Sequence, residues 1–222
     1  MICIPIMARN NTEAIQKMAA TAPLADMMEI RLDVMESFDL KDILEAASKP
    51  VMVTYRSKKE GGSGLSPYEA RIRYLSRAVE LGADFVDVEF NMPQIYRQEI
   101  FLAEGSSRLI ISAHLSNNTP PQEGLEDRVR KMAATGADIV KLVTYAREPE
   151  DNLRVLGLIP LARELGIKII AFCMGPAGRI SRIFTLMMGG HVSFASLEEG
   201  QESASGQIPV KKMKQLLEML EA

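Results

Sequence analysis

The sequence of 222 residues contains no tryptophan, two cysteines and two histidines, and only 5% of its residues are aromatic. Two isolated cysteines, Cys3 and Cys173, do not make a disulfide framework, which favours a reducing compartment. Histidine and cysteine are also too few and too scattered to predict a metal-ligand cluster. No apolar run reaches the length that spans a bilayer, and the first residues lack the basic region of a secretion signal. We therefore expect a cytoplasmic protein without a membrane partner.

An excess of positive charge is also missing. The chain carries 26 lysine and arginine residues against 29 aspartate and glutamate residues, for a formal net charge of −3. Without a basic stretch, the sequence predicts no nucleic-acid-binding surface. Hydrophobic residues make up 47% of the chain, enough for one substantial core. No linker or compositional break is visible, so we expect a single domain over residues 1–222.

Short apolar segments alternate with segments of helical periodicity along the whole chain. The apolar segments cover residues 2–7, 27–33, 51–56, 85–90, 109–114, 139–145, 167–173 and 192–196. The clearest helical patterns cover residues 67–79, 126–134, 152–165, 180–188 and 210–220. Eight strands that alternate with helices predict an α/β fold of the (β/α)8 TIM-barrel type. A doubly wound open sheet is the alternative, but no Gly-x-Gly-x-x-Gly follows the first strand to favour it.

A lysine inside an apolar strand is the most informative single residue. Lys141 lies in the segment Ile139-Val140-Lys141-Leu142-Val143, although lysine is rarely buried without a partner. Burial disfavours an ammonium ion, and a neutral amine can form a Schiff base with a carbonyl substrate. The structural alternative is a lysine at a strand end whose ammonium reaches solvent. His114 ends the preceding strand and could transfer protons beside such an amine.

Charged residues gather where the strands end, which is where barrel enzymes build their active sites. Alternation along the second strand predicts that Glu29, Arg31 and Asp33 share one face, directed toward the barrel mouth or toward a structural ion network. Arg56 ends the third strand and suits a carboxylate, and Glu60 follows on a glycine-rich loop.

The remaining candidates follow the fourth, seventh and eighth strands. Asp87 and Glu89 share one face of the fourth strand, and an acid there can orient an imidazole. Arg182 lies near the start of a helix after the seventh strand, and residues 199–207 form a small, polar loop that could close over a ligand. The second histidine, His191, precedes the eighth strand at the opposite end of the barrel, and we assign it no catalytic role.

These residues together resemble the type I 3-dehydroquinase family, the Schiff-base dehydratases of the shikimate pathway. The resemblance extends from near the N-terminus to about residue 210 and rests on the following motifs, in the order of the family: Glu29-x-Arg31-x-Asp33, Thr54-x-Arg56, Glu60-Gly61-Gly62, Asp87-x-Glu89, Ser112-x-His114, Gly136-Ala137-Asp138-Ile139-x-Lys141, Gly178-Arg179-x-Ser181-Arg182 and Ser203-Ala204-x-Gly206-Gln207.

The resemblance implies a hydro-lyase that converts 3-dehydroquinate to 3-dehydroshikimate, as a homodimer and with no metal or organic cofactor. It implies that Lys141 forms the Schiff base, that His114 is the general acid and base, and that Glu60 orients His114. Asp87 is expected beside His114 as a supporting acid. Arg182 is expected to bind the substrate carboxylate. The other expected substrate-binding residues are Glu29, Arg31, Arg56, Ser203 and Gln207.

The chain departs from the family pattern at a few positions. Ala113 replaces a residue that is often aromatic, Phe172 a methionine, and Ser205 a proline of the closing loop. No departure removes a proposed catalytic group. Two other functions remain open at this point: a class I aldolase-type lyase that handles a sugar phosphate, and a non-catalytic barrel that binds a small acid.

Overall fold

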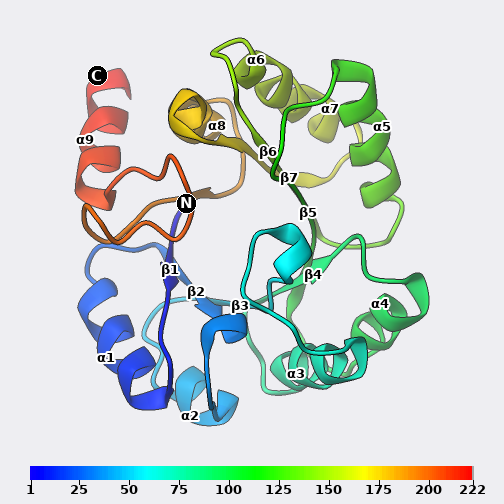
Figure 1. Ribbon diagram of the computed structural model, residues 1–222, viewed down its shortest axis with the longest axis vertical. Helices are drawn as coiled ribbons and strands as arrows, with labels where there is room; N and C mark the ends of the chain where they lie inside the picture. Colours follow the sequence, from blue (N-terminus) through cyan, green and yellow to red (C-terminus); the bar gives the residue numbers. More distant parts are fainter. Residues whose placement is uncertain (222) are drawn as a thin grey trace.

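The computed structural model describes residues 1–221 and forms a nearly closed barrel of parallel strands surrounded by helices (Figure 1). The strands are β1 (Ile2–Ile6), β2 (Met27–Arg31), β3 (Val51–Thr54), β4 (Phe85–Glu89), β5 (Arg108–Leu115), β6 (Ile139–Tyr145), β7 (Lys168–Met174) and β8 (Ser193–Phe194). The helices are α1 (Asn11–Thr21), α2 (Leu40–Glu45), α3 (Tyr68–Glu80), α4 (Gln94–Phe101), α5 (Gln122–Ala133), α6 (Asp151–Leu156), α7 (Leu158–Glu164), α8 (Arg179–Met187) and α9 (Val210–Glu221).

The strand order confirms the predicted (β/α)8 barrel. Strands β1 to β7 pair in sequence order, and β8 pairs with β1, all in parallel. The two ends of this order, β7 and β8, meet where the backbone N–H of His191 donates to the carbonyl oxygen of Ile169 at 2.7 Å. Parallel strands covered on both faces explain the nearly continuous apolar segments of the sequence.

The side chains inside the barrel are apolar at one end of its axis and polar or charged at the other. Near the N-terminal ends of the strands it is filled by apolar side chains, including Cys3 beside Met27 and Met52 beside Phe85. Separate apolar clusters lie between the strands and the helices. Toward the C-terminal ends, the buried side chains become polar and charged, and this layer is the floor of the candidate site.

Several element boundaries differ from the sequence prediction for local reasons. Strand β2 ends at Arg31, and the chain turns at once into a 3₁₀ helix, Leu32–Val34. The helix predicted over residues 152–165 is two helices that meet at Gly157. Pro160 explains the division, because proline cannot donate the backbone hydrogen bond that would continue the first helix.

Helices α1, α2 and α4 were not identified from periodicity. Helix α1 does carry a local start signal: the side chain of Asn10 accepts from the N–H of Glu13, whose carboxylate accepts from the N–H of Arg9. None of the helices within residues 1–221 combines the length and the hydropathy that a membrane crossing needs.

Candidate active site

A cavity opens at the C-terminal ends of the strands, and most of the predicted site residues line it. Nine of the ten predicted residues contribute to its wall. Asp87 lies just beneath, in contact with the lysine of the cavity floor. The nine lining residues are Glu29, Arg31, Arg56, Glu60, His114, Lys141, Arg182, Ser203 and Gln207.

Lys141 on β6 is buried and does not reach solvent, with 3% of its surface exposed. Its Nζ lies 2.9 Å from Oδ2 of Asp87 and 3.5 Å from Oε1 of Glu29. The same atom lies 4.4 Å from the centre of the Phe194 ring. The structural alternative of a solvated strand-end lysine is therefore wrong: the amine is held inside the barrel by two carboxylates and one ring face, facing the cavity.

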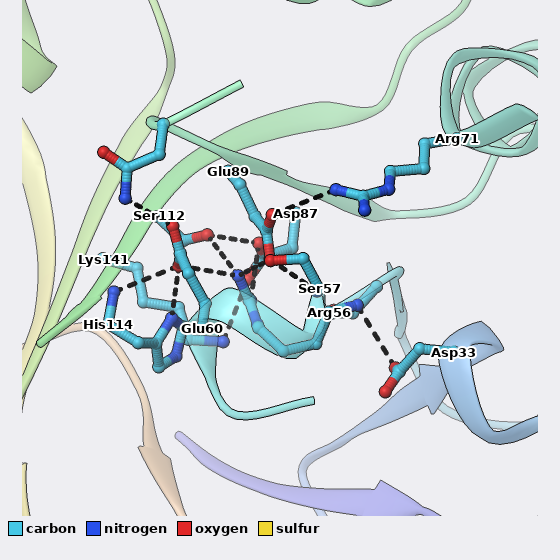
Figure 2. A network of polar contacts seen from close by, with 12 residues as sticks. Asp33, Arg56, Ser57, Glu60, Arg71, Asp87, Glu89, Ser112, His114 and Lys141 are labelled. Atoms are coloured by element: carbon cyan, nitrogen blue, oxygen red, sulfur yellow. Dashed lines mark hydrogen bonds and ion pairs between the residues drawn. The ribbon is translucent and has the colours of Figure 1, made fainter. Parts of the chain in front are cut away.

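Arg56 lies at the centre of a buried network of charges (Figure 2). Its guanidinium is 2.8 Å from Oδ1 of Asp87 and within 3.4 Å of the carboxylates of Glu60 and Glu89. It also donates to Oγ of Ser112, which in turn donates to Asp87. Burial acts to raise the pKa of Asp87, but the charges of Arg56 and Lys141 outweigh it and hold that pKa below its usual range.

Asp87 lies close enough to His114 for each charge to act on the other, and its hydrogen bonds are made to other groups. The sequence reasoning expected it to support His114, but its hydrogen bonds go to Lys141 and Ser112. The side chain therefore acts directly on the amine. Its carboxylate charge reaches His114 only through space.

Glu60 reaches the site because its loop is tightly folded. It ends a 3₁₀ helix, Lys58–Glu60, that Gly61 closes with a φ of +83°. Gly62 allows the loop to fold back onto the segment that follows β3, since a Cβ there would lie 2.3 Å from the carbonyl oxygen of Arg56. The glycine-rich segment is thus an ordered turn that holds a buried carboxylate.

Glu60 and His114 form a contact on the wall of the cavity. Oε2 of Glu60 is 3.1 Å from both the ring Nδ1 and the backbone N of His114. Because Nδ1 is held by the carboxyl group, Nε2 is the nitrogen left for proton transfer. In this arrangement the carboxyl group of Glu60 fixes the orientation of the imidazole ring.

The pKa values of Glu60 and His114 are both shifted from their ordinary values. Burial raises the pKa of Glu60 to about 7, against the opposing charge of Arg56. Burial also holds the pKa of His114 well below its usual value, and the positive charges of Arg56 and Lys141 add to this effect. The imidazole is therefore uncharged at neutral pH, which suits a general base.

Arg182 is a buried cation without an acidic partner. Only 1% of its surface is exposed, and no side-chain carboxylate within residues 1–220 lies within 4.0 Å of its guanidinium. The guanidinium donates to the carbonyl oxygens of Phe194 at 3.4 Å and Ser205 at 3.2 Å, and its Nε has no hydrogen-bond partner in the described part of the chain. Burial lowers the pKa of Arg182 to about 10, so the group stays charged at neutral pH. An anion is the missing partner.

The segment after β8 closes the cavity from above. Ser203 and Gln207 bind each other, with Gln207 Nε2 donating to Ser203 Oγ at 3.0 Å. Gly206, at a φ of +81°, lies so close to Gly175 that a Cβ would come within 2.2 Å of its carbonyl oxygen. The N–H of Gly175 donates to the carbonyl oxygen of Ser205. The loop therefore rests on the turn after β7, with both predicted side chains facing the cavity.

Strand β2 supplies Glu29 and Arg31 to the cavity wall. Glu29 is buried, accepts from Oγ1 of Thr54 at 2.8 Å and contacts Lys141. Arg31 forms a two-point ion pair with Asp33 at 2.7 and 2.8 Å, which fixes the guanidinium at the cavity edge. Asp33 also accepts from the loop that follows β3, so it is the structural member of this trio.

Sequence reasoning missed two groups of side chains. Asn91 directly follows β4 and donates from Nδ2 to Oε1 of Glu60 at 2.9 Å. Its place at the C-terminal end of a barrel strand was the signal that could have found it. Phe194 lines the cavity as well, but an apolar residue inside a strand gives no functional signal of its own. Phe172 lines it too, and the sequence had marked this residue only as a departure from the family pattern.

His191 lies away from the cavity, before β8 as predicted. Its ring packs edgewise against that of Phe85, 6.4 Å between centres, and burial lowers its pKa to about 4. Among the residues described, no group of three or more histidine, cysteine, aspartate or glutamate side chains is arranged to hold a metal ion.

Comparisons with known proteins agree with this geometry. The sequence model of the family "Type I 3-dehydroquinase" matches residues 2–222. A 3-dehydroquinate dehydratase of Syntrophobacter fumaroxidans is 38% identical over 209 residues, which are 90% of this chain and 88% of that one.

Two solved structures are similar over nearly the whole chain. The 3-dehydroquinate dehydratase of Geobacillus kaustophilus is 29% identical, with a TM-score of 0.88 over 99% of this chain and 90% of that one. A type I enzyme of Clostridium difficile, solved with covalently modified comenic acid, is 26% identical, with a TM-score of 0.87 over 99% and 91%. The matched family model and these relatives lead to one conclusion: the chain belongs to the type I 3-dehydroquinase family.

Proposed function

We propose that this chain carries out its family's reaction through a Schiff base on Lys141 and proton transfer by His114. The reaction is the elimination of water from 3-dehydroquinate to give 3-dehydroshikimate, and the chain is a hydro-lyase. The observation that carries the residue assignment is the buried amine of Lys141 on the floor of a cavity that also holds the His114 and Glu60 pair.

The first step is the condensation of Lys141 with the C3 carbonyl of the substrate. Asp87 and Glu29 are the carboxylates nearest to the ammonium and hold it at the cavity. His114, the uncharged base of the cavity, takes up the proton of the ammonium and returns it to the departing oxygen. The free amine then adds to the carbonyl carbon, and the carbonyl oxygen leaves as water. A covalently modified ligand in the Clostridium difficile relative supports covalent chemistry in this fold.

The second step is the elimination itself. The positively charged imine draws electrons from the neighbouring carbon and acidifies the proton on C2. His114 removes this proton through Nε2 and passes it to the C1 hydroxyl group, which departs as water. A further water molecule hydrolyses the imine, releases the product and restores the amine of Lys141.

Substrate binding follows from the charges around the cavity. Arg182 binds the substrate carboxylate, because it is the buried cation that no side-chain carboxylate within residues 1–220 neutralises. The hydroxyl groups and the ring are held by Glu29, Arg31, Arg56, Ser203 and Gln207. Arg56 also keeps Glu60 and Asp87 in place, as its ion pairs indicate.

Borohydride trapping tests this assignment. The protein is incubated with 3-dehydroquinate and borohydride, and the modified peptide is identified by mass spectrometry. A reduced adduct on Lys141 is expected, and none on the Lys141→Ala variant, which should also lose nearly all turnover. Trapping by a sugar phosphate in place of 3-dehydroquinate would support the aldolase alternative. A folded wild type that forms no adduct would overturn the proposal.

The wider predictions also belong to this proposal: a single domain over residues 1–222, a cytoplasmic location, no nucleic-acid or membrane partner, and a homodimer. The apolar side chains of Ile180, Phe184 and Met187 are partly exposed on one side of α8 and support an interface there. Light scattering after gel filtration should give twice the chain mass. The proposed reaction needs no metal ion, so activity should survive dialysis against a chelator.

A further inference from the structure

Two aromatic rings lie next to each other at the cavity, and each one carries a cation. Phe172 on β7 and Phe194 on β8 have ring centres 5.8 Å apart, tilted by 48°. Nζ of Lys141 lies 4.4 Å from the centre of the Phe194 ring. Cζ of Arg182 lies over the Phe172 ring, 4.6 Å from its centre. Both distances fall within the range of a cation–π interaction, and all four side chains are buried.

The two cations differ in what else holds them. Lys141 is bound by the carboxylates of Asp87 and Glu29. Arg182 has only two long hydrogen bonds to carbonyl oxygens, and one of these carbonyls belongs to Ser205 in the closing loop. A movement of the loop would remove the hydrogen bond to Ser205. The Phe172 ring belongs to a strand, so its contact with the guanidinium would remain.

We propose that Phe172 is a positioning residue for substrate binding: its ring face holds the guanidinium of Arg182 in place for the substrate carboxylate. The inference deepens the proposed function and rests on it. A guanidinium that lies over a ring keeps its N–H edge free for a two-point bond to a carboxylate. The ring supports the positive charge without neutralising it, so the charge remains available to the substrate.

The test compares the binding of quinate, which keeps the carboxylate but has no C3 ketone, with the kinetics on 3-dehydroquinate. Phe172→Leu removes the ring face and should raise both the Kd for quinate and the KM for 3-dehydroquinate about 5- to 30-fold. The kcat should stay within about threefold, because the ring acts through Arg182, whereas the amine of Lys141 lies over the other ring, that of Phe194. Phe172→Tyr keeps the ring face and should restore binding.

Phe85→Leu is the matched control. Phe85 belongs to the same apolar cluster inside the barrel, but it contacts Arg108 and His191 at the other end. The control loses the same volume and should leave the Kd for quinate unchanged. If the leucine variant of Phe172 fails to fold, as judged by circular dichroism, Phe172→Met replaces it.

A double-mutant cycle separates positioning from simple packing. In an Arg182→Ala background, Phe172→Leu should change the Kd for quinate by no more than about twofold, because the group that the ring positions is gone. The inference would be overturned if Phe172→Leu raised the Kd for quinate no more than Phe85→Leu does. It would also be overturned if Phe172→Leu raised this Kd equally with and without Arg182. The proposed function can also fail separately. If the wild type neither turned over 3-dehydroquinate nor formed an adduct with it, while Phe172→Leu still raised the Kd for quinate, the proposed function alone would be overturned.

Discussion

Glu60→Gln offers the most direct test of the electrostatics of this cavity. Glutamine keeps the shape of the side chain, and its carbonyl oxygen can still accept from Asn91 or from the imidazole of His114. What it removes is the titration of a carboxyl group whose pKa burial raises from 4.5 to about 7. The variant should therefore lose the part of the pH dependence of stability, and of activity, that comes from the ionisation of Glu60.

The sign and size of the stability effect follow from proton binding. The folded state keeps Glu60 protonated up to about pH 7, whereas the unfolded state does so only up to about pH 4.5. The folded state binds the extra proton between these values, so the ionisation of Glu60 lowers the free energy of unfolding as the pH rises. The whole effect is about 3 kcal/mol. Relative to wild type, Glu60→Gln should gain about that much free energy of unfolding between pH 4.5 and 7.

Urea unfolding of both proteins, followed by circular dichroism from about pH 4.5 to about pH 7.5, measures this difference. His114 acts in the opposite direction, because its lowered pKa makes stability rise with pH up to its ordinary value of 6.5. That contribution is present in both proteins, so the comparison isolates Glu60. Glu164→Gln on α7 provides a control, since it makes the same chemical change at a residue that is exposed to solvent. A wild-type-to-variant difference that stays constant across this range would refute the buried-carboxyl reasoning.

The pH dependence of kcat/KM tests the ionisation of Glu60 independently of stability. His114 acts as a base through Nε2 only when its other nitrogen, Nδ1, donates to an ionised Glu60. In wild type, kcat/KM should rise with pH and level off above about pH 7. The Gln variant should be slower and should lose this rise.

Three other substitutions have distinct expected outcomes. His114→Ala should still trap the imine on Lys141 but lower kcat by about 10²- to 10⁴-fold, and wild-type turnover in that variant would point to another base. Arg182→Ala should raise KM by about 10- to 150-fold through the loss of a charged hydrogen bond, with Arg182→Lys between the two; equal KM values would place the carboxylate elsewhere. Asn91→Ala removes a donor to Glu60 and should move the rise of kcat/KM to higher pH, unlike the exposed Asn118→Ala, and a shift to lower pH would contradict this.

The parts of the fold that local sequence governs were predictable. Continuous apolar segments identified all eight strands, and β6 was predicted with its observed bounds. Helices were harder where the apolar stripe is weak or short, and α1, α2 and α4 were missed. The division at Gly157 could have been predicted, because Pro160 carries its signal in the sequence itself.

The gathering of the site residues was also predictable, because a parallel barrel brings the ends of its strands to one mouth. The partners of each charged group were not. Lys141 contacts a glutamate 112 residues away in sequence, and Asp87 binds this lysine where the sequence suggested the histidine. Asn91 went unnoticed because a single amide after a strand is ordinary until its partner is known.

The sequence by itself determined the barrel and the kinds of chemical groups at its mouth, because periodicity and strand-end position are local properties of a chain. Only the tertiary structure decided which charges are neutralised and which are not. It showed that the amine of Lys141 is buried between carboxylates and that Arg182 is buried with no side-chain carboxylate of residues 1–220 beside it. These states depend on distances between segments far apart in the chain, and the free energy of a charge inside a protein depends on those distances.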